Sequence, residues 1–123
     1  MPVRERQRLC AVSLAAALLS GVAVSATAAE SPKGDIAAGK AIAMDRAKGN
    51  CIACHVLPGG DSPGAIGPAL VAMKSRFPSK EALAKQIWDP TVRNPDTVMP
   101  PFGKHAILTE KEFNAVVDYI WSL

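Results

Sequence analysis

Five consecutive residues, Cys51-Ile52-Ala53-Cys54-His55, carry the clearest chemistry in this chain of 123 residues. Two cysteines three positions apart, followed at once by a histidine, form the pattern that attaches a c-type haem covalently. Each thiol adds to one vinyl group of the porphyrin, and the adjacent imidazole then lies beneath the ring as an axial ligand of the iron. The pattern therefore predicts that Cys51 and Cys54 bind one haem c and that His55 ligates its iron.

Two other kinds of site use the same residue types. A zinc site needs four ligands. The cysteines and histidines after residue 29 are Cys51, Cys54, His55 and His105. Their spacing resembles no common zinc finger. A thiol oxidoreductase needs a strand before its cysteine pair, whereas a helix is predicted before Cys51, and that function leaves His55 without a role.

The ligand opposite His55 decides what such a haem does, because a strong ligand gives an electron carrier and an open position gives ligand binding or catalysis. The candidates are Met44, Met73, Met99 and His105. We favour Met99, because enough chain separates it from His55 to pass round the haem edge. Two prolines follow Met99, and they hold an extended segment rigid without backbone hydrogen bonds.

The other three candidates have simpler explanations. Met73 lies in an apolar stretch, where packing in the core is expected. Met44 lies near the helix before Cys51, which makes it difficult to place on the face of the haem opposite His55. His105 is interpreted as a loop histidine. On the histidine side of the haem, a ligating imidazole usually donates its second ring N–H to a nearby acceptor. Gly67-Pro68 is the candidate segment, with Pro68 as the candidate acceptor and an ordinary turn as the alternative.

The first 29 residues have the features of a secretory signal peptide. Three arginines among the first eight residues precede an uncharged run over residues 9–29, and Ala26-Thr27-Ala28 supplies a small-residue cleavage pattern. We expect cleavage after Ala28 or Ala29, leaving a single domain over residues 30–123, with an uncleaved membrane anchor as the alternative. Haem attachment of this type requires export, so the leader and the haem pattern both predict a periplasmic protein.

Export also limits the chemistry of the mature chain. Cys10 leaves with the leader, and the haem pattern uses Cys51 and Cys54, so no free thiol remains and we predict no catalytic residue. The formal net charge is +3, much of it from the leader arginines, and the lysines are scattered through the chain. The sequence thus has no basic stripe for nucleic acid and no charge block for membrane binding after cleavage.

Helices are predicted where capping residues and apolar spacing coincide. The first covers Ile36 to Lys48, with Asp35 as N-cap and Gly49 as the residue that ends it. Gly39 inside it costs about 1 kcal/mol of helix propensity relative to alanine. Close approach of another helix would explain Gly39, and a tolerated surface glycine is the alternative.

Another helix is expected over Lys80 to Asp89, between Ser79 as N-cap and Pro90 as the stop. It should bury Leu83 and Ile87, with Trp88 as a further candidate. Residues 68–76 are predicted to form a short helical segment.

The C-terminal helix has the strongest signal, because Thr109 and Glu112 form a capping box. The apolar residues that follow at helical spacing are Phe113, Val116, Val117, Ile120 and Trp121. Residues 56–67 and 91–108 are long irregular segments rich in glycine and proline, which a flat apolar haem would give something to pack against. No strand-like alternation is present, so the predicted class is all-α, with three to four helices and long loops around one haem.

The order of helix, Cys-x-x-Cys-His, Gly-Pro, Met-Pro and C-terminal helix resembles class I cytochrome c across residues 30–123. A narrower resemblance lies in GNCIACHVLPGGDSPGAIGPAL (residues 49–70), MKSRFP (73–78) and QIWDPTVRNPDTVMPPFGKHAILTE (86–110). These segments are similar to the SoxX family, the monohaem subunits of the SoxAX cytochromes of sulfur oxidation.

The SoxX resemblance implies a periplasmic heterodimer with a SoxA-like haem subunit. In that complex SoxA carries the active-site haem and the catalytic cysteine, thiosulfate is conjugated oxidatively to a cysteine of the carrier protein SoxY, and the SoxX subunit passes electrons to a downstream acceptor. The resemblance also implies Cys51 and Cys54 as haem attachments and His55 and Met99 as iron ligands. A freely diffusing cytochrome c, serving an oxidase or a reductase, is the alternative, because it would share the same haem site.

Overall fold

The computed structural model describes residues 35–123, so the predicted signal peptide and the domain boundary at residue 30 lie outside the described residues. The described chain contains α1 (Ile36–Met44), α2 (Met73–Arg76), α3 (Lys80–Trp88) and α4 (Glu110–Ser122). Two short 3-10 helices, η1 (Cys51–Ala53) and η2 (Pro90–Val92), complete its regular structure, and residues 35–123 contain no strand. The all-α prediction is confirmed.

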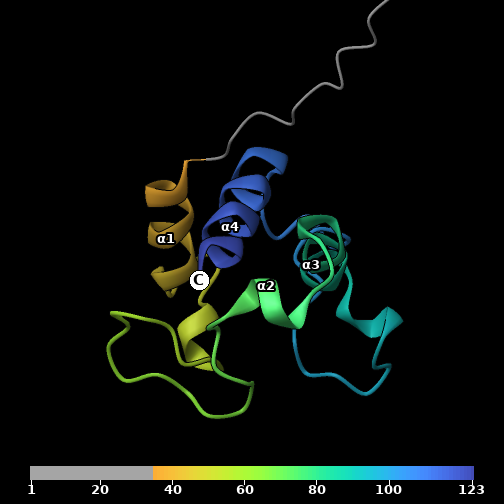
Figure 1. Ribbon diagram of the computed structural model, residues 1–123, viewed down its shortest axis with the longest axis horizontal. Helices are drawn as coiled ribbons and strands as arrows, with labels where there is room; N and C mark the ends of the chain where they lie inside the picture. Colours follow the sequence, from red (N-terminus) through yellow and green to blue (C-terminus); the bar gives the residue numbers. More distant parts are fainter. Residues whose placement is uncertain (1–34) are drawn as a thin grey trace, which may run out of the picture.

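Helices α1 and α4 lie side by side and form the main packing unit of the fold (Figure 1). Gly39 lies at their contact, where a Cβ atom on this residue would be 2.0 Å from the carbonyl oxygen of Ala115 and 2.9 Å from Cβ of Tyr119. Such distances leave no room for a side chain. The predicted close approach of another helix is therefore confirmed as the reason for Gly39.

The C-terminal helix begins as its sequence predicts. The Thr109 hydroxyl accepts a hydrogen bond from the backbone N–H of Glu112, whose carboxylate accepts one from the N–H of Thr109. Its buried residues are Phe113, Ala115, Val116, Val117, Tyr119 and Ile120. The ammonium group of Lys48 also donates to the Glu112 carboxylate, which joins the turn after α1 to the start of α4.

The first helix ends four residues earlier than predicted, at Met44. Asp45 has extended backbone angles, and its carboxylate accepts a hydrogen bond from the N–H of Ala47 at 2.8 Å. The chain then folds back so closely that the N–H of Gly49 reaches the carbonyl oxygen of Ile42 at 3.2 Å. The predicted helix over residues 45–48 is wrong, because the Asp45 side chain stabilises a turn there.

Helix α3 agrees with its prediction to within one residue. The Ser79 hydroxyl accepts from the N–H of Ala82 at 3.2 Å, and Pro90 follows the end of the helix. Leu83 and Ile87 are buried as predicted. Trp88 is 48% exposed and packs edge to face against Phe113, with ring centroids 5.3 Å apart.

The helical prediction for residues 68–76 holds only for the last four residues, which form α2. The residues before it are drawn into contacts with distant segments: the N–H of Leu70 bonds to the carbonyl of Val56, and that of Ala72 to the carbonyl of Leu123, both at 2.8 Å. Ala72 also has a left-handed backbone, with φ of 51°. The predicted helix over 68–72 is wrong because these longer-range hydrogen bonds replace helical ones.

Two long loops extend from the same end of the helical unit, one between η1 and α2 and one between η2 and α4 (Figure 1). Their inward apolar residues are Leu57, Leu70, Phe102 and Leu108. By contrast, Ile66 and Val98 are more than two-thirds exposed, at 71% and 74%. None of the helices between residues 35 and 123 combines the length and the apolar character needed to cross a membrane.

Candidate haem site

The two cysteines and the histidine of the attachment pattern lie on one tight turn of the chain. Asn50 enters it with a left-handed backbone, φ 47°, and Cys51–Ala53 then form η1. The carbonyl oxygen of Cys51 accepts from the N–H groups of Cys54 at 3.2 Å and His55 at 2.9 Å. Both cysteines are free and partly exposed. This turn thus presents two thiols and an imidazole from five successive positions.

The imidazole of His55 is held by the Gly67-Pro68 segment. Its Nδ1 lies 2.6 Å from the carbonyl oxygen of Pro68, the acceptor residue expected from the sequence. Because a carbonyl oxygen only accepts, Nδ1 carries the proton in this contact and Nε2 keeps a lone pair for a metal. A Cβ on Gly67 would lie 2.3 Å from Cε1 of His55, so the glycine backbone packs directly on the ring.

The four candidates for the second ligand lie in different surroundings. Met73 is 1% exposed, and Nη1 of Arg76 approaches its sulfur at 3.5 Å, so it serves the core as expected. His105 is exposed, and the Met44 sulfur faces Gly60. Met99 is partly buried against the core. It lies in the long loop between η2 and α4, far along the chain from the Cys-His turn.

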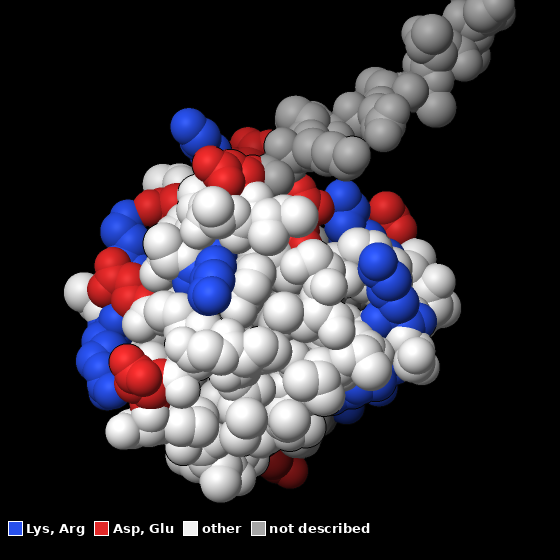
Figure 2. Space-filling model, turned by 60° about the vertical axis from the view of Figure 1, so that its left-hand side comes forward, with Lys and Arg blue, Asp and Glu red and all other residues white. Residues whose placement is uncertain are grey.

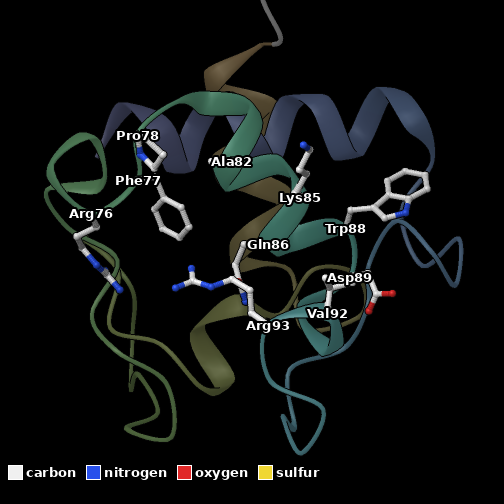
Figure 3. A pocket seen from close by; sticks show the side chains of 10 residues that line it. All are labelled: Arg76, Phe77, Pro78, Ala82, Lys85, Gln86, Trp88, Asp89, Val92 and Arg93. Carbon is white, nitrogen blue, oxygen red and sulfur yellow. The ribbon is translucent and has the colours of Figure 1, made fainter.

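A pocket of about 510 Å³ lies below α3, between the end of α2 and η2. Its lining residues are Arg76, Phe77, Pro78, Ala82, Lys85, Gln86, Trp88, Asp89, Val92 and Arg93. Figure 3 shows Phe77 and Arg93 approaching each other across this space, with the guanidinium carbon 6.0 Å from the ring centroid. Gln86 carries a buried Oε1 atom that has no hydrogen-bond partner within the protein.

These features fit a haem. The residues that line the pocket do not include Cys51, Cys54, His55 or Met99. Its aromatic and aliphatic walls would suit the apolar ring of a haem, and its cationic residues Arg76, Lys85 and Arg93 would suit the propionates. Sequence reasoning missed this cationic lining. Arg76 and Arg93 are far apart along the chain and belong to no motif, so only the fold brings them to one pocket.

The two rival chemistries fit less well. Among residues 35–123, no three His, Cys, Asp or Glu side chains converge as ligands of a metal ion, whereas a zinc site needs at least three protein ligands. Burial raises the pKa of the Cys51 thiol to about 11. A reactive thiol has a lowered pKa instead, so the environment of Cys51 gives no support to a thiol oxidoreductase.

Comparison with known proteins agrees with the site. The chain is similar to an uncharacterized lipoprotein of Aquifex aeolicus (strain VF5), with 34% identity over 77 residues that cover 59% of this chain and 36% of the relative. The chain thus spans about a third of that relative's length. The family model for cytochrome c matches residues 36–123, most of the chain. Such a domain indicates an extracytoplasmic protein. The chain belongs to the cytochrome c family, and it is an electron-transfer protein of the kind that binds haem c covalently.

Proposed function

We propose that this chain is the monohaem electron-transfer subunit of a SoxAX-type cytochrome in the periplasm. In this role it accepts electrons while a SoxA-like haem subunit conjugates thiosulfate to the cysteine of a SoxY-type carrier, and it passes them to a downstream acceptor. It acts in an L-cysteine S-thiosulfotransferase only as a subunit. The observation that carries the proposal is the Cys51-Cys54-His55 turn with its imidazole held by Pro68.

One haem is attached to Cys51 and Cys54 in this proposal, with His55 and Met99 as its axial ligands. Haem supplies a one-electron couple, and a methionine ligand raises its reduction potential relative to a second histidine. The protein's part is to fix the imidazole by the Pro68 contact and to present the thioether sulfur. Arg76, Lys85 and Arg93 of the pocket would balance the negative charge of the propionates.

The sulfur chemistry is assigned to the partner for a simple reason. Within residues 35–123 the only cysteines are Cys51 and Cys54, and haem attachment consumes both thiols. A thiosulfate-derived sulfur therefore has no thiol on this domain to which it can bond. The domain relays electrons, and the covalent intermediate forms elsewhere.

Two features support a partner subunit over a freely diffusing carrier. The long loop sequences of residues 49–70 and 86–110 resemble SoxX beyond the haem motif. In addition, the side of the molecule that carries α1 and the loop after η1 has a broad area without charged side chains (Figure 2). That loop contributes the exposed apolar residues Val56 and Ile66. Exposed apolar side chains within an uncharged area are typical of a protein interface, whose centre is depleted of charged residues.

Co-expression tests the proposal. The full chain, with an affinity tag at its C-terminus, is expressed in the periplasm with and without a SoxA-like haem subunit. We expect a stable heterodimer that is reduced when thiosulfate and a SoxY-type carrier are added together. A matched control replaces Met99 with alanine and should still bind its partner but transfer electrons poorly. A stable monomer that ignores the partner and is inert to thiosulfate would support the free carrier instead.

A further inference from the structure

Asp89 lies where the loop that carries Met99 leaves α3, and its two carboxylate oxygens hold different ends of that loop. Oδ1 accepts from the N–H of Thr91 at 3.1 Å and from its hydroxyl, which fixes the start of the loop in η2. Oδ2 accepts from the ammonium group of Lys104 at 2.6 Å, where the loop returns. One side chain thus joins the first and last turns of the segment between them.

The backbone closes the loop at the same place. The carbonyl oxygen of Trp88 accepts from the N–H groups of Gly103 at 3.3 Å and Lys104 at 3.2 Å. A Cβ on Gly103 would lie 1.9 Å from Cε3 of Trp88, so the glycine backbone packs directly against the indole. The returning segment of the loop, at Gly103 and Lys104, therefore packs against the end of α3, next to Asp89.

Asp89 is buried, so its carboxylate depends on the contacts with Thr91 and Lys104 to compensate for its lost solvation. Asp89 is 9% exposed, and no other charged residue among those that the structure describes is buried to this extent. A buried carboxylate is costly unless hydrogen bonds and an opposite charge compensate it. Lys104 first, and then Thr91, hold the pKa of Asp89 below its ordinary value, so the group stays ionised and bound to both ends.

Met99 lies in the middle of the closed loop. Its own N–H donates to the Thr97 hydroxyl at 3.2 Å, and Pro100 and Pro101 stiffen the residues after it. A thioether is a weak iron ligand, so its binding depends on a loop that does not open easily. We propose that Asp89 is a positioning residue that holds Met99 in place by clamping residues 91 and 104 together. This inference rests on the ligation by His55 and Met99 proposed above.

Competition with imidazole measures how easily the loop opens. Added imidazole binds ferric iron only after the methionine detaches, so its apparent Kd falls as the open population rises. A variant that opens the loop about tenfold more often should bind imidazole about tenfold more tightly. The experiment uses the purified ferric holoprotein and follows the titration by haem absorption.

The chain offers a matched control. Asp118 pairs with Lys80 at 2.7 Å, and its side chain is 12% exposed, compared with 11% for Asp89. We expect Asp89→Asn to lower the apparent Kd for imidazole about tenfold and to weaken the far-red absorption band of methionine-ligated ferric haem. Asp118→Asn should leave both values within about twofold of the wild type, because it lies outside the loop.

A second variant covers the case in which Asp89→Asn does not fold. Lys104→Met removes the return contact while Asp89 keeps its hydrogen bonds to Thr91, and Lys104 is 53% exposed, so the fold should tolerate it. It should tighten imidazole binding severalfold. The positioning role is overturned if both loop variants, or the one that folds, behave like Asp118→Asn.

A Met99→Ala variant distinguishes a failure of the proposed iron ligation from a failure of the role of Asp89. If it keeps the far-red band and the wild-type affinity for imidazole, Met99 is not the ligand, and the ligation fails together with the role of Asp89. If Met99→Ala loses the band while the loop variants match the control, the ligation stands and the role of Asp89 alone is wrong.

Discussion

Nδ1 of His55 lies 2.6 Å from the carbonyl oxygen of Pro68, a residue 13 positions later in the chain. The neighbouring Gly67 packs its backbone on the same ring, where a side chain would overlap with it. The two residues have complementary effects: Gly67 leaves space for the imidazole, and Pro68 fixes its rotation. Because Nδ1 is occupied by this contact and the ring is fixed, the lone pair of Nε2 keeps one direction. A fixed lone pair of this kind is what ligation of a metal ion requires.

Gly67→Ala should disturb this arrangement. The added methyl would lie 2.3 Å from Cε1 of His55, so the ring or the loop must move. We expect a loss of about 1–3 kcal/mol in the free energy of unfolding of the holoprotein, typical of overpacking at a tight site. A shift in the haem absorption spectrum should accompany it. Chemical denaturation and ferrous spectra measure the two effects.

The control for Gly67→Ala is Ala65→Val, which adds methyl groups at an exposed site of the same loop. It should change stability by less than about 0.5 kcal/mol and leave the spectrum as it is. Equal effects of the two substitutions would show that the contact of Gly67 with His55 is not the cause.

Gly39→Ala tests the helix pair. Alanine gains about 1 kcal/mol of helix propensity over glycine. Its Cβ would, however, lie 2.0 Å from the carbonyl oxygen of Ala115, so α1 and α4 must separate. We expect a net destabilisation of about 1–3 kcal/mol in urea unfolding. Ala41→Val, exposed on the same helix, should cost less than about 1 kcal/mol, and a stabilising Gly39→Ala would contradict the close packing.

Glu112 gives the stability of the protein a pH dependence with a definite sign. Its pKa is lowered from 4.5 to about 2, mainly by the hydrogen bond from Lys48 and then by the N–H and hydroxyl of Thr109. A carboxylate with a lowered pKa stabilises the fold above its unfolded pKa, and this contribution is lost as pH falls through the folded pKa. Stability conferred by Glu112 should therefore decline between about pH 4.5 and 2.

Glu112→Gln measures this contribution in acid unfolding experiments. The wild type should be more stable than the variant near neutral pH, and the difference should shrink below pH 4.5 and be nearly absent below about 2. Glu110→Gln removes a carboxylate from the same helical turn without removing the Lys48 contact, and it should retain the wild-type profile. A difference for Glu112→Gln that stays constant as pH falls would contradict the assignment.

Covalent attachment makes a prediction for the three cysteines of the chain. The wild type should carry one haem per chain by pyridine haemochrome assay, and the haem should stay bound under denaturing conditions. The double variant Cys51→Ala/Cys54→Ala should release any haem it binds. Cys10→Ala, in the predicted leader, should keep full covalent haem. A double variant that retains haem after denaturation would rule out thioether attachment.

Much of this fold can be predicted from local sequence. The capping box of Thr109 and Glu112 predicts the start of α4, and Gly39 predicts a close helix contact, because each depends on a few neighbouring residues. The Cys-His pattern is likewise local. By contrast, α1 ends early because the Asp45 carboxylate stabilises a turn by accepting from the N–H of Ala47, although the sequence favours Gly49 as the residue that ends the helix.

The parts of the site that sequence did not reveal depend on contacts between distant segments. Arg76 and Arg93 meet at one pocket only because α2 and η2 flank α3. The sequence predicts Asp89 as the last residue of a helix and gives no sign that its carboxylate joins Thr91 to Lys104.

We propose that the Cys-His turn serves an electron relay in which His55 and Met99 are the ligands of the haem iron. The most direct test is the far-red absorption band of the ferric holoprotein, compared in the wild type, Met99→Ala and His105→Ala. We predict the band in the wild type and in His105→Ala. In Met99→Ala we predict its loss together with a fall in reduction potential of at least ~60 mV, a tenfold change in a one-electron equilibrium. Persistence of the band in Met99→Ala, or its loss in His105→Ala, would contradict it.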